Sequence, residues 1–263
     1  MTTLFAIVDA FTGVPFAGNP AAVCLVPTPR DATWMQLVAR EMNLSETAFL
    51  QRQGDAFALR WFTPTVEVKL CGHATLASAH MLWESGQIMP DEPARFDTLS
   101  GRLTCRRMGD WIEMDFPAQV CAPCAPPVGL AEALGCEVQT ACCNGMDYLV
   151  EVADEQTLRG LTPNSGALAK YPVRGAIVTC RSDAAEYDFV SRFFAPAAGV
   201  NEDPVTGSAH CALGPYWQAK LGRSDLVAYQ ASARGGVVKV GVRGDRVLLG
   251  GQAVTVSRVE LLV

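Results

Sequence analysis

Three ionisable side chains stand where a helix or a strand is expected to begin: Glu46, His73 and Asp203. Glu46 lies among apolar and hydroxyl residues, where partial loss of hydration is expected to raise its pKa towards a value useful for acid and base catalysis. His73 and Asp203 each stand near the start of an expected helix, whose first amides can hold an anion. Acids and a histidine around an anion cradle predict proton transfer at a carbon next to a carboxylate, as in an isomerase or epimerase.

Each of these residues also has a purely structural interpretation. A single Glu is more often a helix cap or a surface residue, and a single His is more often structural than catalytic. Asp203 precedes Pro204 and could cap a helix. Only their combination with the surrounding turns favours a site, which is why we treat the three as candidate catalytic residues.

Two glycine turns, one that contains His73 and one that follows Asp203, are copies of one pattern. Cys71–Ala77 and Thr206–Ala212 both read x-Gly-x-Ala-x-x-Ala, and each is preceded by an Arg-aromatic-Phe-x-Pro segment, Arg60–Pro64 and Arg192–Pro196. Arg192 follows Arg60 by 132 residues and Gly207 follows Gly72 by 135, so the second copy has a three-residue insertion. The repeat predicts two related domains, residues 1–117 and 118–263, with the last strand free to return to the first domain.

Packing of the two copies about a pseudo-twofold axis would place both turns at an interdomain cleft, the usual place for a small-molecule site. Gly72, Gly207 and Ser208 are therefore candidate substrate-binding residues. Asn19 is a fourth candidate, because the turn Gly18-Asn19-Pro20 could present its side chain to a ligand. Asn and Gly before Pro are nevertheless more often plain turn residues.

Hydrophobic spacing predicts a helix over residues 32–42 with Asp31 as its N-cap, and helices that begin at the two glycine turns. Residues 96–105 and 111–116 alternate apolar and polar side chains and predict the two strands of a hairpin. The remaining expected elements are strands over residues 4–11, 21–26, 57–62, 147–152, 175–180, 189–194, 237–242, 247–249 and 253–262, and a short helix over 130–134.

Composition excludes several classes of function. The chain has 263 residues, of which 49% are hydrophobic and 18% charged, with a net charge of −6. Its 21 basic residues are scattered, which argues against nucleic acid as a partner. The apolar runs are too short for a membrane span, and the amino terminus has no secretory pattern, so we expect a cytoplasmic protein with a small ligand.

The sequence has no phosphate loop, dinucleotide fingerprint or metal-ligand cluster, so we expect neither a cofactor nor a metal. Ten cysteines are spread through apolar segments, and we expect all of them to be reduced. Cys121 and Cys124 form a CxxC, but their nearest partners, Cys136 and the pair at 142–143, lack zinc-ribbon spacing. A zinc or redox role there is the less favoured interpretation.

Three motifs in order resemble the PhzF-like (phenazine biosynthesis) family: residues 43–49 (NLSETAF), 71–75 (CGHAT) and 202–209 (EDPVTGSA). The similarity extends from residues 11–20 to residues 249–253. It implies an α+β fold like that of diaminopimelate epimerase, with two related domains that each curl a sheet around a central helix. It also implies a small carboxylate substrate, a homodimer, an acid/base role at Glu46, and site positions at His73, Asp203 and Ser208.

The wider epimerase superfamily uses two facing cysteines as acid and base. Cys71 matches the first of them, whereas the repeat places Thr206 at the second, and a hydroxyl is far too weak an acid to serve as a base near pH 7. The carboxylate mechanism is therefore preferred to a two-cysteine racemase. Two further alternatives stay open: a hydrolase or lyase that uses Ser208, His73 and Asp203, and a ligand-binding protein without catalysis. The substrate is not determined by the sequence.

Overall fold

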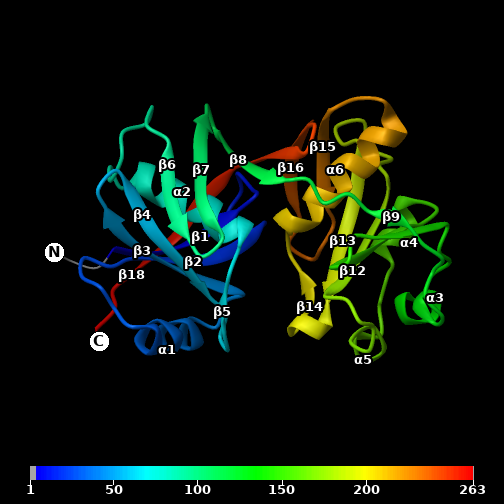
Figure 1. The fold of residues 1–263 in the computed structure, drawn as a ribbon, viewed down its shortest axis with the longest axis horizontal. Helices are drawn as coiled ribbons and strands as arrows, with labels where there is room; N and C mark the ends of the chain where they lie inside the picture. The colour runs from blue at the N-terminus through cyan, green and yellow to red at the C-terminus, as the bar shows by residue number, and fades with distance from the viewer. Residues whose placement is uncertain (1–3, 263) are drawn as a thin grey trace. The chain divides into compact units, whose positions relative to one another are not determined.

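The computed structural model describes residues 4–262, which form two compact units. The first unit comprises the chain as far as Asp115 together with the segment from Gly250 onwards, and the second comprises Phe116–Leu249. The second unit therefore ends before the carboxyl end of the chain, because the last strand pairs with the first strand of the first unit. Figure 1 shows this strand, in red, among the blue strands of the amino-terminal segment.

The first unit consists largely of strands, with two long helices. Its elements are β1 (Leu4–Ala10), β2 (Asn19–Leu25), α1 (Ala32–Met42), β3 (Glu46–Gln53), β4 (Ala56–Phe62), β5 (Glu67–Val68), α2 (Gly72–Glu84), β6 (Ala94–Thr98), β7 (Gly101–Met108), β8 (Trp111–Pro117) and β18 (Ala253–Val259). β1 pairs antiparallel with both β2 and β18.

The second unit uses the same kinds of element. They are β9 (Ala122–Pro123), α3 (Leu130–Leu134), β10 (Thr140–Cys143), β11 (Asp147–Glu151), α4 (Glu155–Arg159), α5 (Ser165–Leu168), β12 (Gly175–Arg181), β13 (Phe189–Ala195), the 3₁₀ turn η1 (Pro196–Ala198), β14 (Val200–Asp203), α6 (Gly207–Leu221), β15 (Asp225–Gln230), β16 (Gly236–Arg243) and β17 (Arg246–Gly251).

The two units repeat one succession of strand pairings. In the first, β2 pairs parallel with β3 across α1, β3 pairs antiparallel with β4, and β4 pairs antiparallel with β5 and parallel with β6 across α2. In the second, β11 pairs parallel with β12 across α4 and α5, β12 pairs antiparallel with β13, and β13 pairs antiparallel with β14 and parallel with β15 across α6. This is the topology that a duplicated sequence produces.

A repeated ion pair accompanies the repeated topology. The guanidinium of Arg60 on β4 binds both carboxylate oxygens of Glu67 on β5, at 2.7 and 2.8 Å. The guanidinium of Arg192 on β13 binds Glu202 on β14 in the same way, at 2.7 and 2.9 Å. Glu67 follows Arg60 by seven residues and Glu202 follows Arg192 by ten, so the three-residue insertion lies between β13 and β14, where η1 forms.

The helix α2 is the core of the first unit. Nearly all its side chains from His73 to Trp83 are buried, and it contacts β1, β2, β3 and β18. A helix that is buried on most of its faces lacks a polar stripe, in keeping with the run of Ala, Leu and Met in its sequence. The fold is therefore α+β, with a sheet curled around this helix (Figure 1).

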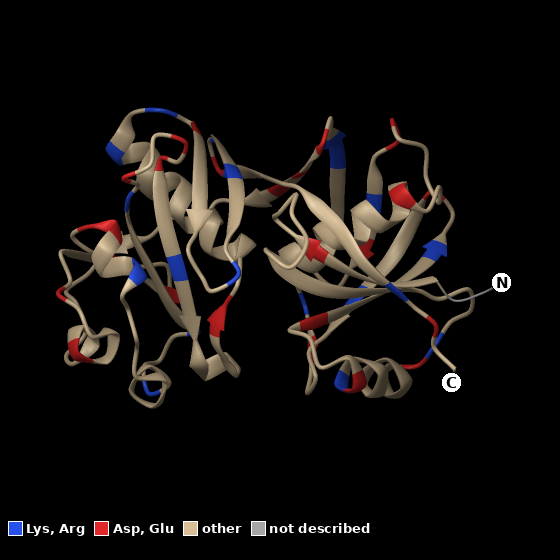
Figure 2. Cartoon of the chain, turned by 180° about the vertical axis from the view of Figure 1, so that it is seen from behind, with Lys and Arg blue, Asp and Glu red and all other residues tan. Residues whose placement is uncertain are grey.

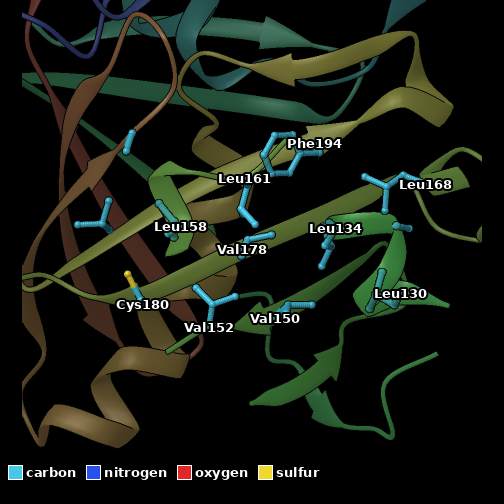
Figure 3. Packing of buried hydrophobic residues seen from close by; sticks show 14 residues of the cluster. Leu130, Leu134, Val150, Val152, Leu158, Leu161, Leu168, Val178, Cys180 and Phe194 are labelled. Carbon is cyan, nitrogen blue, oxygen red and sulfur yellow. The ribbon is translucent and has the colours of Figure 1, made fainter. Parts of the chain in front are cut away.

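The second unit has a well-packed apolar cluster of its own. Side chains from α3, α4 and α5 pack against β11, β12 and β13, and Figure 3 shows Leu130, Leu158 and Leu168 in one cluster with Val178 and Phe194. On the helix α6, a Cβ at Gly214 would come within 2.9 Å of Val240 on β16. Glycine at this position lets α6 approach β16 closely.

The structure confirms most of the expected elements and corrects one. Helix α1 spans the expected residues, and the side chain of Asp31 accepts a hydrogen bond from Trp34 at 2.8 Å, as an N-cap does. The expected single strand over 96–105 is instead two antiparallel strands, β6 and β7, joined by a tight turn between Thr98 and Gly101. In this turn Gly101 has a φ of 97°, and Thr98 accepts a hydrogen bond from Ser100. The alternation of apolar and polar residues continues through the turn, and for this reason the sequence pattern predicted one strand.

Charged residues are interspersed through each unit rather than gathered in a single block (Figure 2). Among residues 4–262, the structure has no helix with the length and apolar character needed to cross a membrane.

The two Arg–Glu pairs differ in burial and thus provide a matched comparison. The Arg192 side chain is 11% exposed and also donates to three backbone carbonyls, those of residues 158, 159 and 161, whereas the Arg60 side chain is 33% exposed. We expect Arg192→Met to lower the free energy of unfolding by about 3 kcal/mol, because it leaves a carboxylate and three carbonyls without their partner. Arg60→Met should cost about 1 kcal/mol.

Urea unfolding followed by circular dichroism measures both variants. Equal losses, or a larger loss for Arg60→Met, would contradict the assignment of the Arg192 network as the stronger of the two.

Candidate functional site

Three strand and helix ends of the first unit bring Asn19, Glu46 and His73 together. Asn19 is the first residue of β2, Glu46 the first of β3, and His73 the second of α2. The turn before β2 requires glycine, because Gly18 has a φ of 66° and a Cβ there would lie 2.2 Å from the Ala10 carbonyl oxygen. This turn directs Asn19 inwards, where its side chain is fully buried.

His73 is the centre of this group. Its Nδ1 lies 3.2 Å from Nδ2 of Asn19 and 3.5 Å from Sγ of Cys71, and its Nε2 lies 3.3 Å from Oε2 of Glu46. Nε2 has no hydrogen bond in the structure, so its contact with Glu46 is close but not aligned as a hydrogen bond. The side chains of His73 and Glu46 are 6% and 19% exposed, which withdraws both from bulk water.

Burial lowers the pKa of His73 from its ordinary value to about 3, so the imidazole is neutral at neutral pH. The hydrogen bonds also assign its tautomer. Ser45 donates to Oδ1 of Asn19 at 3.4 Å, which leaves the Asn19 amide nitrogen as the group that faces Nδ1. Nδ1 then accepts, and the imidazole proton is on Nε2, next to the carboxylate of Glu46.

The two central helices begin without a side-chain cap. The side chains of Asp31, Asp154 and Asn164 each accept a hydrogen bond from the first turn of α1, α4 and α5. The N-cap residues of α2 and α6 are Cys71 and Thr206, and neither caps its helix with its side chain. An uncapped helix start presents amide donors and a partial positive charge, which suits a carboxylate ligand.

In the second unit, Asp203 and Thr206 belong to one hydrogen-bond network. Thr206 donates its hydroxyl proton to Oδ2 of Asp203 at 2.5 Å, which explains why this Thr, a common cap residue, does not cap α6. Gln230 is fully buried; its amide nitrogen donates to the Asp203 carbonyl oxygen at 2.7 Å, and its Oε1 accepts from the Thr206 backbone at 2.9 Å. Gly207 and Ser208 follow directly as the first residues of α6.

His210 supports the same helix start from inside. Its Nδ1 bonds the Thr206 carbonyl oxygen at 2.8 Å, and its buried Nε2 has no hydrogen-bond partner. Burial lowers the pKa of His210 to about 4, so this ring is also neutral at neutral pH. In the first unit, the hydroxyl of Thr75 occupies the equivalent place and donates to the Cys71 carbonyl oxygen at 2.5 Å.

The structure places the predicted candidates in two groups: Asn19, Glu46, Gly72 and His73 in the first unit, and Asp203, Gly207 and Ser208 in the second. Sequence reasoning missed Gln230 and Ser45, which hydrogen-bond to candidate residues and fix their orientation. Nothing in the sequence marks Gln230, since it is a single polar residue at the end of an apolar strand. Asn19, for which a plain turn role was the alternative prediction, makes a buried contact with His73.

His80, which we set aside in the sequence, has a structural role at the other end of α2. Its Nε2 lies 3.2 Å from the hydroxyl of Thr255, which itself donates to Glu84 at 2.7 Å. A cavity of about 360 Å³ is lined by His80 and Glu84, with Arg107 among the other residues. None of the candidate site residues lines this cavity, so the candidate site is argued from the polar groups around His73 and not from the size of a cavity.

The buried neutral histidines predict a loss of stability in acid. As pH falls, the unfolded chain protonates His210 near its ordinary pKa of 6.5, whereas the folded chain does so only near 4. The free energy of unfolding should thus fall by about 2 kcal/mol between pH 7 and pH 5 for this residue alone. Urea unfolding at both pH values should show a drop that is smaller by that amount in His210→Gln, and an unchanged drop would contradict the burial of a neutral ring.

The tautomer of His73 can be observed directly. We expect the ¹⁵N spectrum of the ring to show a protonated Nε2 and an unprotonated Nδ1 at pH 7, with signals assigned by single variants of the three histidines. Asn19→Asp replaces the amide donor with an acceptor and should move the proton to Nδ1. Ser45→Ala keeps the amide and serves as the control. A proton on Nδ1 in the unaltered protein would overturn the assignment.

The chain is similar to known proteins over nearly its whole length. Residues 8–259 match the PhzC-PhzF family, described as phenazine biosynthesis-like protein. An uncharacterized isomerase of Halalkalibacterium halodurans is 56% identical over 264 residues and is covered in full, as is this chain. An uncharacterized isomerase of Pseudomonas aeruginosa is 50% identical over 250 residues, which cover 94% of this chain and 93% of that protein.

Solved structures agree with these relatives. The crystal structure of a phenazine biosynthesis PhzF family protein of Enterococcus faecalis has a TM-score of 0.96 and 40% identity, with both chains covered in full. A hydroxyproline epimerase of Agrobacterium vitis has a TM-score of 0.62 and 15% identity, over 98% of this chain and 91% of that one. The second likeness shows a shared epimerase-like fold only. The chain therefore belongs to the PhzC-PhzF family of phenazine biosynthesis-like proteins, and it is an isomerase.

Proposed function

We propose that this isomerase moves a proton on a small carboxylate substrate without a cofactor, with Glu46 as the acid and base. The single observation that carries the proposal is the contact between Glu46 and neutral His73 at the uncapped start of α2. The substrate carboxylate would bind the first-turn amides of this helix, which places the adjacent carbon near Glu46.

Glu46 suits the role of proton carrier because its carboxylate is partly withdrawn from water and lies at a fixed strand start. In the proposed reaction, the carboxylate takes a proton from the carbon next to the bound carboxylate or from a carbon conjugated with it. The electron pair passes into the conjugated system, and the protonated Glu46 returns the proton at another carbon. The same group thus serves as base and then as acid.

His73 has the separate role of stabilising the charge that develops on the substrate. A neutral imidazole with its proton on Nε2 is a hydrogen-bond donor and a poor base, and its low pKa keeps it in that state. Asn19 fixes the ring by bonding Nδ1. We therefore assign His73 as a donor to the substrate or to Glu46 rather than as a second base.

The second unit is proposed to hold the rest of the substrate across an interdomain cleft. Asp203, fixed by Thr206 and Gln230, would bind an amino or hydroxyl group of the substrate, and the start of α6 at Gly207 and Ser208 would provide further donors. This part of the proposal follows from the repeat and from the family resemblance. The homodimer and the cytoplasmic location stay predictions.

The same hydrogen bonds disfavour the two alternative catalytic mechanisms. A two-base mechanism needs a base opposite Cys71, yet its counterpart Thr206 donates its hydroxyl proton to Asp203. A hydrolase triad of Ser208, His73 and Asp203 needs Asp203 to orient His73, but the ring is oriented by Asn19 and the Asp203 carboxylate is engaged by Thr206.

Glu46→Gln provides the direct test of the mechanism. The amide keeps the shape of the side chain but cannot carry the proton, so deuterium incorporation into a substrate should fall by at least about 10²–10⁴-fold. Cys71→Ser should retain much of the activity. The substrate is first identified by screening unsaturated and amino carboxylic acids in deuterated water, with mass spectrometry as the readout.

The two variants separate the mechanisms cleanly. An inactive Cys71→Ser beside an active Glu46→Gln would assign the chain to the thiol-based racemases. Thermal unfolding of both variants checks that neither result arises from a loss of fold.

A further inference from the structure

The side chains of Glu46, Cys71 and His73 also form a compact set of metal-ligand atoms. One carboxylate oxygen, the thiol sulfur and one ring nitrogen all lie within 4.8 Å of one another. On the Nε2 side of the His73 ring, Oε2 of Glu46 lies 3.3 Å from the nitrogen, while Sγ of Cys71 lies 3.5 Å from Nδ1 of the same ring. These are the three side-chain types that bind zinc in proteins.

The separation between Oε2 of Glu46 and Nε2 of His73 already suits tetrahedral coordination. Zinc bonds of about 2.0–2.3 Å at tetrahedral angles hold neighbouring ligand atoms about 3.3–3.6 Å apart. Because no two of the ligand atoms are more than 4.8 Å apart, the sulfur of Cys71 would have to approach Nε2 by about 1 Å at most to complete three tetrahedral positions. A thiolate ligand favours zinc over magnesium or calcium, which prefer oxygen ligands.

The surroundings of the three side chains also favour the binding of a metal ion. The sulfur belongs to the N-cap residue of α2, where the start of the helix stabilises negative charge. Nε2 of His73 is buried without a hydrogen-bond partner and faces Glu46. A metal on Nε2 would move the imidazole proton to Nδ1, and Asn19 could accept it by turning its amide so that the oxygen faces the ring.

We propose that Glu46, Cys71 and His73 bind one zinc ion, with the fourth position open to water or to a substrate carboxylate. Binding displaces the Cys71 thiol proton to solvent and occupies the carboxylate that carries the substrate proton. Zinc is thus an inhibitor of the isomerase rather than its cofactor, and this consequence rests on the proposed function. The binding itself does not.

Cobalt(II) is the probe for binding, because a thiolate ligand gives it a charge-transfer absorption band. Tag-free protein, freed of metal with a chelator, is titrated with cobalt and then with zinc. We expect one equivalent of cobalt to produce the band and one equivalent of zinc to remove it, whereas magnesium should not. Cys71→Ser should abolish the band, and Glu46→Gln should keep it but weaken binding by at least about tenfold.

Cys124→Ser is the matched control, since Cys124 belongs to the CxxC on the second unit and is also a free thiol. Its band should equal that of the unaltered protein. A band that survives in Cys71→Ser and disappears in Cys124→Ser would place the metal at the CxxC and overturn the proposal, as would the absence of any band. Circular dichroism checks the fold of each variant.

The inhibitory consequence is tested separately by proton exchange on the identified substrate. Stoichiometric zinc should block exchange in the unaltered protein, and a chelator should restore it. A cobalt band together with zinc-insensitive exchange would overturn the inhibitory role. The cobalt titration needs no substrate, so it distinguishes a failure of the zinc site from a failure of the proposed function.

Discussion

The structure of the site depends on one constraint, which is that α2 is buried on most of its surface and begins without a cap. A buried helix start would normally be costly, since its first amides lose water and need acceptors. In α1, α4 and α5 an Asp or Asn side chain supplies the acceptor, but α2 begins at Cys71 and α6 at a Thr206 whose hydroxyl is used elsewhere. In these two central helices, the side chain of the N-cap residue does not occupy the first amides, an arrangement that suits an anionic ligand.

The same burial determines the chemistry of His73. The ring is buried at the start of the helix, and desolvation keeps it neutral. A neutral ring needs one acceptor and one donor partner, and Asn19 provides the donor. Burial therefore makes His73 a poor base, which is why the proposed mechanism gives the acid/base role to the more accessible carboxylate of Glu46.

Much of this could be predicted from the sequence because it is local. Glycine turns, the cap at Asp31 and the repeated Arg-aromatic-Phe-x-Pro segments are short patterns with direct structural meanings, and they located Glu46, His73 and Asp203 correctly at element ends. The β6–β7 turn was missed because its alternating pattern continues through Ser100. Gln230 was missed because its importance arises only when β15 is placed beside Thr206, a long-range contact that no single segment encodes.

The duplicated scaffold explains why the two halves can differ so sharply at their helix starts. The pairing order and the Arg–Glu clamp between adjacent strands are the same in both units, so the framework does not depend on the residue at the N-cap. In the first unit that residue is a thiol beside an imidazole, and in the second it is a hydroxyl committed to a carboxylate. A fixed hydroxyl–carboxylate pair can bind a substrate but cannot readily exchange its proton, whereas the group around Glu46 and His73 combines a partly exposed carboxylate with a neutral hydrogen-bond donor. In the proposed mechanism, the asymmetry between two otherwise similar units corresponds to a division between substrate binding and proton transfer.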